Sequence, residues 1–229
     1  MKLFYFILAG LLLTTVEAGA QRKTYKIQPG VKIINALPPE EVFEYPNFVQ
    51  SEIYFKKGNS GLARLNYNAL YGEIQFIDPK GDTLSLDDEA TVRFIVILSD
   101  TFYFDKLFVK QVKAFGEVRL AKRTYFKLVN SQKLGGFGET TGGSVDTYDR
   151  ISSQGTFKDL VAKEILTLAK DSALFLADRF RHLTRVTKKG LQSFYPGKES
   201  QLAAYLKENK VNFNDEADIT RLMQFMMNQ

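Results

Sequence analysis

The fold is predicted most directly from residues 63–86, which read ARLNYNALYGEIQFIDPKGDTLSL. Ala63, Leu65 and Tyr67 occupy every second position, and Ile74 and Phe76 repeat this spacing further along. Residues 78–81, Asp-Pro-Lys-Gly, then supply a tight turn before Leu84 and Leu86. Alternation with a period of two between turn residues indicates half-buried antiparallel strands.

The same pattern extends outward from this stretch. Before it, residues 53–55 end in a turn at 57–61 that is rich in glycine and asparagine. After it, residues 92–98 are apolar at nearly every position, which predicts a strand covered on both faces. Further strands are expected at 108–115, 117–121 and 125–129. We therefore predict an α+β, mainly β fold, in which an antiparallel meander over 51–133 forms a small barrel or sandwich.

Two segments without strand periodicity border this β domain. Residues 21–50 contain four of the six prolines and are expected to form an irregular lead-in. Residues 134–156 are rich in glycine but match neither the P-loop pattern nor a dinucleotide-binding GxGxxG, so a flexible surface loop is the better interpretation. This loop divides the chain into two halves.

The second half, 157–229, is predicted to contain a β-hairpin followed by two to three short helices. Alternation over 161–168, a turn at 170–172 and an apolar run at 174–176 favour the hairpin, although a helix over 158–170 also fits the spacing. Thr187 is expected to cap the first helix, residues 199–210 form the second, and Asn214 caps the last. In that last helix Ile219, Leu222, Met223 and Met226 share one face, as core residues do.

Residues 1–20 are interpreted as a secretory signal peptide. Lys2 precedes an apolar run from 3 to 16, and small residues stand at 18 and 20, three positions and one position before a cut at Gln21. The run is too short to span a bilayer, which takes about 20 apolar residues. No cysteine follows that could accept a lipid, so we expect a periplasmic or extracellular protein that is not a lipoprotein. The absence of a twin-arginine pair favours the general secretory route.

The net charge of +5 is concentrated in two stretches. The first supplies the candidate contacts to an anionic lipid, lipopolysaccharide or glycan surface, which are Lys106, Lys110, Lys113, Arg119, Lys122, Arg123 and Lys127. The second contains Arg179, Arg181, Arg185, Lys188 and Lys189. The alternative interpretation is that both stretches are simply the solvated faces of strands. No motif for nucleic-acid recognition accompanies them.

Catalytic and metal-binding chemistry is poorly represented. The chain has one histidine, His182, and no cysteine, which excludes thiol catalysis and the usual zinc sites. His182 follows Arg179 and Arg181, whose charges disfavour an imidazolium, and no GxSxG elbow is present. The acidic residues at 78–89 have no defensible ligand spacing, and those at 212–218 lack the glycine and glutamate of a calcium loop. We predict no cofactor, no metal and no catalytic residue.

Several short stretches resemble uncharacterised exported proteins of Bacteroidetes-type bacteria. They are LNYN at 65–68, GEIQF at 72–76 and DPKGDTL at 78–84, together with KKGL at 188–191 and YLKENKVNF at 205–213. The resemblance implies a bacterial envelope protein and supplies no catalytic residues.

Three functions are consistent with these observations. The first is a non-catalytic envelope protein that binds a protein partner or an anionic surface. The second is a carrier of a small apolar ligand inside a barrel. The third is a hydrolase that uses carboxylates such as Asp87, Asp88 and Glu89. The first is preferred because no catalytic constellation is evident.

Overall fold

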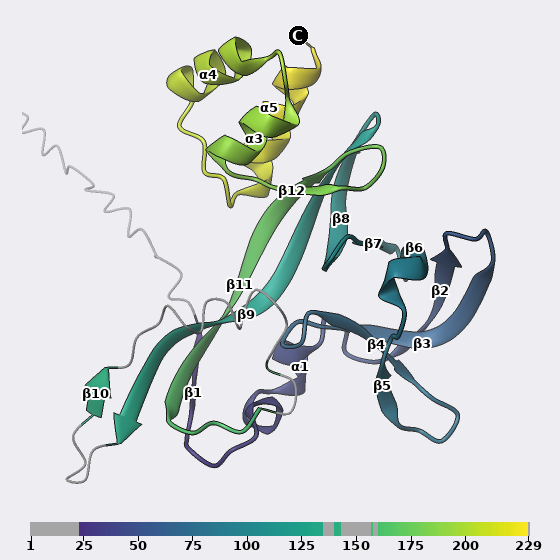
Figure 1. Ribbon diagram of the computed structural model, residues 1–229, viewed down its shortest axis with the longest axis vertical. Coiled ribbons are helices and arrows are strands. Elements are labelled where there is room, and N and C mark those ends of the chain that lie inside the picture. The colour runs from purple at the N-terminus through teal and green to yellow at the C-terminus, as the bar shows by residue number, and fades with distance from the viewer. Residues whose placement is uncertain (1–22, 135–139, 143–156, 158–159, 229) are drawn as a thin grey trace, which may run out of the picture.

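The computed structural model describes residues 23–134, 140–142, 157 and 160–228. The described chain is mainly β, with antiparallel strands joined in one sheet and short helices, mostly at the C-terminus (Figure 1). This confirms the predicted class. The predicted signal peptide, 1–20, lies outside the described residues.

The strands follow a nearly sequential order along the sheet, β1-β11-β9-β8-β7-β6-β2-β3-β4-β5. Their bounds are β1 Thr24–Ile27, β2 Val49–Phe55, β3 Ser60–Asn68, β4 Glu73–Ile77, β5 Thr83–Ser85, β6 Val92–Ile97, β7 Asp100–Phe104, β8 Phe108–Phe115, β9 Val118–Leu134 and β11 Ile165–Ala177. Two short strands lie off this path: β10, Thr140–Gly142, pairs with β9, and β12, Leu183–Arg185, pairs with β11. Because β1 and β5 end the order without pairing to each other, the sheet is open. Of the two predicted arrangements, barrel or sandwich, the barrel is therefore wrong.

Residues 63–86 form β3, β4 and β5, as their alternation predicts. Leu65 and Ile74 are fully buried, and Leu65 pairs across the strands with Phe76. The turn between β4 and β5 is organised by Asp78, whose Oδ1 accepts hydrogen bonds from the N–H groups of Lys80 and Asp82 at 2.9 and 2.8 Å. An aspartate that binds the backbone two residues ahead is the chemistry expected of such a turn.

Two long strands replace the short ones predicted at either side of the glycine-rich loop. β9 runs through 122–124, where the sequence suggested a break between strands, and β11 runs through 170–172, where it suggested a turn. The alternative helix over 158–170 is also wrong from residue 165 onward. The polar residues in both places face each other across the ladder, because Thr124 pairs with Ser172 and Tyr125 pairs with Asp171. Polar residues in the middle of a paired strand thus have the same sequence pattern as a turn.

The long strands β9 and β11 run from the β-rich part of the molecule to the C-terminal helices (Figure 1) and contribute residues to two hydrophobic cores. The first core contains residues of β1–β4 and β6–β8 and of the segment between β1 and β2, together with Phe126 and Leu168 of the long strands. The second contains the C-terminal helices packed on Leu120, Leu174 and Leu176. Tyr103, Ala121 and Phe175 belong to a third, smaller cluster. Each long strand therefore contributes to more than one core.

The strand at 92–98 is covered less fully than predicted. Val92, Ile95 and Ile97 are buried, but Arg93 is exposed and Phe94 and Val96 are only half-buried. Leu98 falls beyond β6 in a turn with φ +55° and is 65% exposed. The strand therefore packs against the core mainly on one face.

The N-terminal lead-in is more ordered than its prolines suggest. Besides β1, it contains a 3-10 turn at Ile33–Ala36 and the short helix α1, Pro39–Val42. The segment after α1 is fixed by buried Asn66, whose Oδ1 accepts from the N–H of Tyr45 and whose Nδ2 donates to the carbonyl of Tyr45. The predicted loop at 134–156 lies mostly outside the described residues, apart from the end of β9 and β10.

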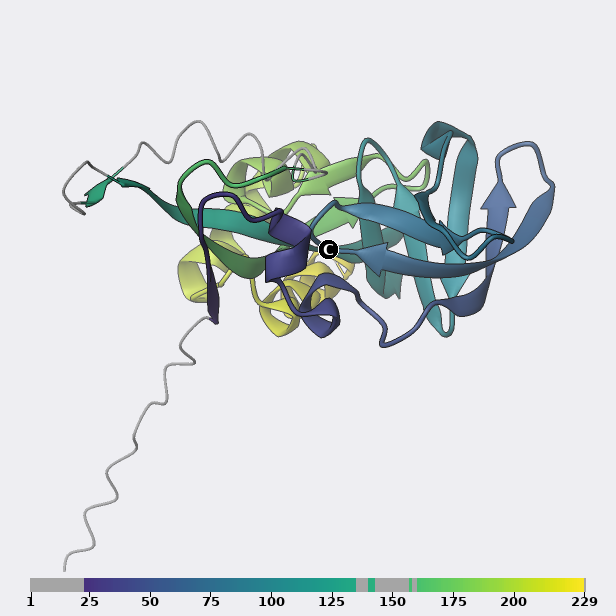
Figure 2. The ribbon, with the colours of Figure 1, turned by 90° about the horizontal axis from the view of Figure 1, so that it is seen from below.

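The C-terminal helices are α3 Lys188–Phe194, α4 Glu199–Glu208 and α5 Glu216–Met227. Thr187 caps α3 as predicted, since its Oγ1 accepts from the N–H of Gly190 at 2.9 Å. The cap of α5 is Asp215 rather than Asn214, because Asp215 Oδ1 accepts from the N–H of Asp218. The predicted apolar face of α5 is buried in the second core. Figure 2, viewed from below, shows this helical unit behind the strands.

Candidate anion-binding site

Three of the seven predicted basic contacts form ion pairs within the protein. Lys110 pairs with Glu44 and Asp100, Lys122 pairs with Glu216 at 2.7 Å, and Lys127 pairs with Asp171. Although burial opposes the charge on Lys110, these carboxylates raise the pKa of its ammonium above the ordinary value. These ion pairs join β8 to β7 and to the segment after α1, β9 to helix α5, and β9 to β11.

Arg123 is not a surface residue. Its side chain is 6% exposed and lies 5.6 Å from the centre of the Tyr125 ring. Its charge also opposes the effect of burial on the pKa of the Tyr67 phenol, which burial raises. The prediction that Arg123 contacts an anionic surface is therefore wrong, and strand alternation could not reveal it because β3 and its following turn cover this part of β9.

The other three predicted residues are accessible but do not form one surface with the rest. Lys106 is exposed in the turn before β8, at φ +64°. Lys113 is exposed with its Nζ 5.5 Å from the Phe115 ring centre. Arg119 is half-buried, and its Nη1 donates to the carbonyls of Gly116 and Val118. The first basic stretch is thus divided among separate structural roles.

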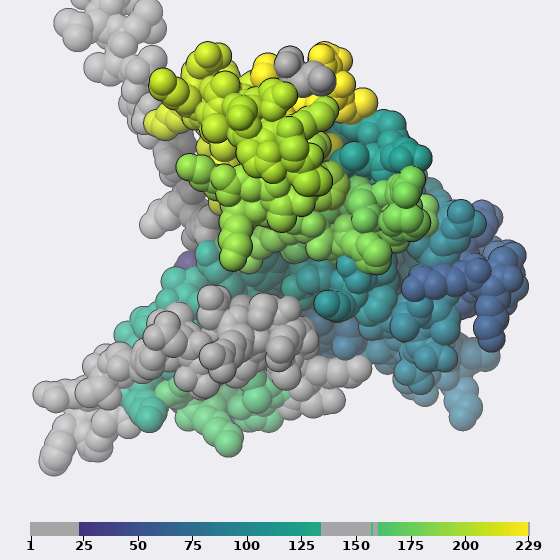
Figure 3. Space-filling view, turned by 45° about the horizontal axis from the view of Figure 1, so that its top comes forward, coloured from purple at the N-terminus to yellow at the C-terminus, as the bar shows by residue number. Residues whose placement is uncertain are grey.

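Arg119 contributes instead to a cleft at the end of the sheet. The β8–β9 turn, the β11–β12 turn and helix α3 surround a cavity of about 470 Å³, and an adjoining cavity of about 200 Å³ shares Glu117, Asp178 and Arg179 with it. In Figure 3 the teal β8–β9 end and the green β11–β12 end lie beside the yellow-green helices. The cleft therefore combines residues from both basic stretches.

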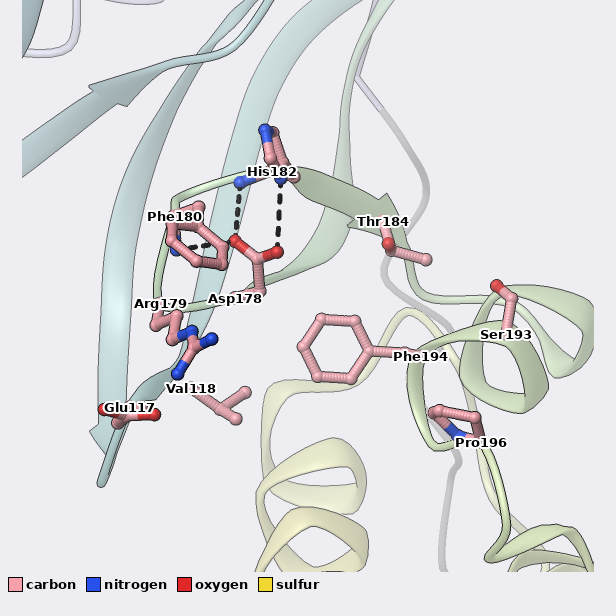
Figure 4. Close-up of a pocket in the computed structure, with 10 residues that line it drawn as sticks. All are labelled: Glu117, Val118, Asp178, Arg179, Phe180, His182, Thr184, Ser193, Phe194 and Pro196. Carbon is pink, nitrogen blue, oxygen red and sulfur yellow. Dashed lines mark hydrogen bonds and ion pairs between the residues drawn. The ribbon is translucent and has the colours of Figure 1, made fainter.

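The cleft has one polar and one apolar side. In Figure 4, Arg179 and Glu117 lie at one rim, Ser193 and Pro196 lie opposite, and Val118 and Phe194 lie between them. A site of this kind offers charged groups to the polar part of a ligand and apolar contacts to the remainder.

Asp178 organises the β11–β12 turn. Its Oδ1 accepts hydrogen bonds from the N–H groups of Phe180 and His182 at 2.8 and 2.9 Å, and its Oδ2 lies 3.2 Å from His182 Nδ1 (Figure 4). Partial burial favours the neutral acid, but these hydrogen bonds outweigh that effect and hold the pKa of Asp178 below its ordinary value. The carboxylate therefore remains charged and is directed to its own turn.

Two arginines within this turn stand on either side of Phe180. Arg179 lies over the Phe180 ring at 4.6 Å, whereas Arg181, at φ +68°, lies over Tyr103 at 4.7 Å. Within the described residues, neither arginine nor Arg119 has a carboxylate at ion-pair distance. These three guanidinium groups can donate to an external anion without first breaking a salt bridge.

His182 and Ser193 do not form a catalytic pair. His182 is exposed and directed to Asp178, whereas Ser193 Oγ donates to the carbonyl of Gly190 at 2.9 Å. Figure 4 places the two side chains at separate ends of the cleft. The described residues also contain no group of three or more metal-binding side chains. The carboxylates proposed for hydrolysis, Asp87, Asp88 and Glu89, stand around the turn before β6 rather than in this cleft.

Comparison with known proteins adds no assignment: no protein-family model, no curated protein and no solved structure matches the chain. The resemblance to exported bacterial proteins therefore stays a prediction. Across the part of the chain that the structure describes, helices long and apolar enough to cross a membrane are absent.

One feature of the sequence other than its charge indicates the cleft. Residues 179–182 read Arg-Phe-Arg-His, and Phe180 in the middle is 66% exposed. A large apolar side chain between cations at a turn predicts a surface loop rather than a strand. What the sequence could not provide is the proximity of this turn to Arg119.

Proposed function

We propose that the protein is a non-catalytic protein of the bacterial envelope that binds the phosphate or carboxylate group of an envelope lipid or glycan. The observation that supports this function is the set of guanidinium groups of Arg119, Arg179 and Arg181 around the cleft, without intramolecular carboxylate partners among the described residues. Guanidinium groups donate in a planar fork that matches phosphate and carboxylate oxygens.

The lining favours an anion attached to a larger molecule over a free ion. Val118, Phe194 and Pro196 provide apolar surface within the same cavity as Arg179. A lipid or a sugar ring can contact that surface while its charged group is held by the arginines. The two alternative functions have less support, because the open sheet has no barrel interior and the proposed hydrolytic carboxylates lie elsewhere.

The proposal is tested with vesicles of phosphatidylcholine, with and without phosphatidylglycerol, and separately with a soluble polygalacturonate oligomer. We expect binding to one of these anionic probes, weakened by added salt because exposed charges are screened. The double variant Arg179→Gln/Arg181→Gln should lose about tenfold in affinity or more, as expected for two charge-assisted contacts.

The matched control is Lys56→Gln/Lys57→Gln, which removes the same charge from the exposed β2–β3 turn. This control should bind like the unmodified protein, and unfolding curves should show that both double variants remain folded. Equal losses in the two variants would indicate nonspecific attraction by net charge. Absence of binding to either probe would contradict the proposed function.

A further inference from the structure

A separate cavity of about 440 Å³ lies between β4–β5 and the segment around α1. Four large apolar or aromatic side chains contribute to its wall: Ile34, Phe43, Tyr71 and Leu84. The polar lining consists of two amides, Asn68 and Gln75, and the hydroxyl residues Thr83 and Ser85, of which Ser85 donates to Glu73. The volume is within the range of small-molecule sites, about 300–1,000 Å³.

The orientation of both amides follows from the backbone around them. Asn68 Oδ1 accepts hydrogen bonds from the N–H groups of Leu70 and Tyr71, both at 3.0 Å. The oxygen of Asn68 is therefore fixed, and its Nδ2 must donate, which it does to Gln75 Oε1 at 3.0 Å. Because an acceptor is needed in this bond, the amide atom of Gln75 that faces Asn68 is the oxygen Oε1. The other amide atom of Gln75 is therefore the donor Nε2.

That nitrogen has unused donor capacity. Gln75 is 6% exposed, and within the described residues its side chain makes no hydrogen bond other than the one from Asn68. Since Gln75 Nε2 is not among the fully enclosed side-chain atoms that lack a hydrogen bond in the described chain, it keeps contact with the cavity. A ligand acceptor that replaces water there gains the net value of one hydrogen bond. The cavity thus offers an amide donor beside its four large apolar or aromatic side chains.

We propose that this cavity binds a small, uncharged, mostly apolar molecule whose carbonyl oxygen accepts a hydrogen bond from Gln75 Nε2. The lining contains no lysine, arginine or histidine, so a carboxylate would enter without a counter-charge. A pure hydrocarbon would fill the volume but leave Gln75 Nε2 unpaired. The inference does not depend on the arginine-lined cleft.

Three probes that share a phenyl ring and a short alkyl chain test this selectivity: valerophenone, pentylbenzene and 5-phenylpentanoate. Their binding to the protein is followed by ¹⁵N NMR, including the side-chain amide of Gln75. We expect the ketone to shift that amide and to bind roughly three- to tenfold more tightly than the hydrocarbon, the range given by one net hydrogen bond. The carboxylate should bind most weakly.

Two variants locate the binding and its polar contact. Leu84→Trp, at a rim position that is 45% exposed, should fill the cavity and abolish binding, whereas Leu62→Trp, at a 69% exposed position on β3, should not. Gln75→Met should remove the preference for ketone over hydrocarbon while leaving hydrocarbon binding in place. Because this variant also removes the partner of Asn68 Nδ2, its folding is checked by its unfolding midpoint.

The proposal would be overturned by equal affinity for ketone and hydrocarbon in the unmodified protein. It would also be overturned if no probe bound, or if Leu84→Trp bound as well as Leu62→Trp. Since none of these substitutions touches the arginine-lined cleft, failure here is distinguishable from failure of the proposed anion binding.

Discussion

Gly72 lies directly against the guanidinium group of Arg123. A β-carbon at Gly72 would stand 2.8 Å from Arg123 Nη2, closer than real side-chain contacts allow. Gly72 also has φ +70°, in the left-handed region where L side chains are disfavoured. The β3–β4 turn can therefore cover a buried arginine of β9 only because residue 72 lacks a side chain.

Gly72→Ala should be destabilising for both reasons. The left-handed backbone costs about 1–2 kcal/mol for a residue with a β-carbon, and displacing the buried guanidinium adds roughly 1–3 kcal/mol, as overpacking does. Gly197→Ala is the matched control, because Gly197 has φ +82° but open space around it. Denaturant unfolding should show a larger loss for Gly72→Ala; equal losses would mean that Arg123 moves aside without cost.

Asn66→Ala should lower the free energy of unfolding by about 2–4 kcal/mol. The buried side chain of Asn66 binds both the N–H and the carbonyl of Tyr45, and its removal leaves these backbone groups without partners. Asn209→Ala removes an exposed amide that donates to the Tyr205 carbonyl, so it should cost far less. Chemical denaturation of both variants checks the comparison, and similar values would contradict the role given to Asn66.

Buried tyrosines should make the fold sensitive to alkali. Burial raises the pKa of Tyr67 to about 12, despite the opposing effect of Arg123, and raises that of Tyr195 to about 12 as well. Burial and the hydrogen bond to Asp100 raise the pKa of Tyr45 still further.

The stability of the fold should fall as the pH rises, because the folded state favours the neutral phenol. The stabilisation is complete below the unfolded pKa, about 10, and is lost as the pH rises through 12. Ultraviolet titration at 295 nm and circular dichroism should therefore show these tyrosines ionising together with unfolding. Tyr67→Phe should lose one phenolate from this late phase; ionisation of all tyrosines near pH 10 in a folded protein would contradict the prediction.

Gly190→Ala should detach helix α3 from the strand before it. A β-carbon there would lie 2.1 Å from the carbonyl oxygen of Arg185, and a backbone oxygen cannot yield as a side chain can. We expect a loss of roughly 1–3 kcal/mol and faster hydrogen exchange at the amides of Val186 and Leu191. Gln192→Ala, on the exposed side of α3, should leave both quantities nearly unchanged.

Strands were predictable where one face meets the core and the other meets solvent. β3 and β4 satisfy this condition, and the Asp78 turn has local chemistry that identifies it. β11 does not, because Leu174 and Phe175 are both buried, in clusters on opposite sides of the sheet. A strand that passes from one core to another changes its buried face, and period-two alternation fails there.

The candidate site was predictable only in part, for a related reason. Charge density identified Arg119, Arg179 and Arg181 as basic residues, but ion pairing depends on carboxylates far away in the chain. Lys122, for example, is paired with Glu216 of α5, whereas Arg119 has no such partner among the described residues. Sequence order does not reveal which charges remain available.

The pairing of β1 with β11 determines when folding can finish. Ile27 lies opposite Leu166, so the first strand of the sheet acquires its partner only after most of the chain has been synthesised. Closing such a long loop is slow, because its entropic cost precedes the gain from pairing. A nascent chain can therefore form the β2–β8 meander early, while β1 waits with its apolar side chains uncovered. The N-terminal strand is thus among the last elements to reach its native place, although it is the first of them to be made.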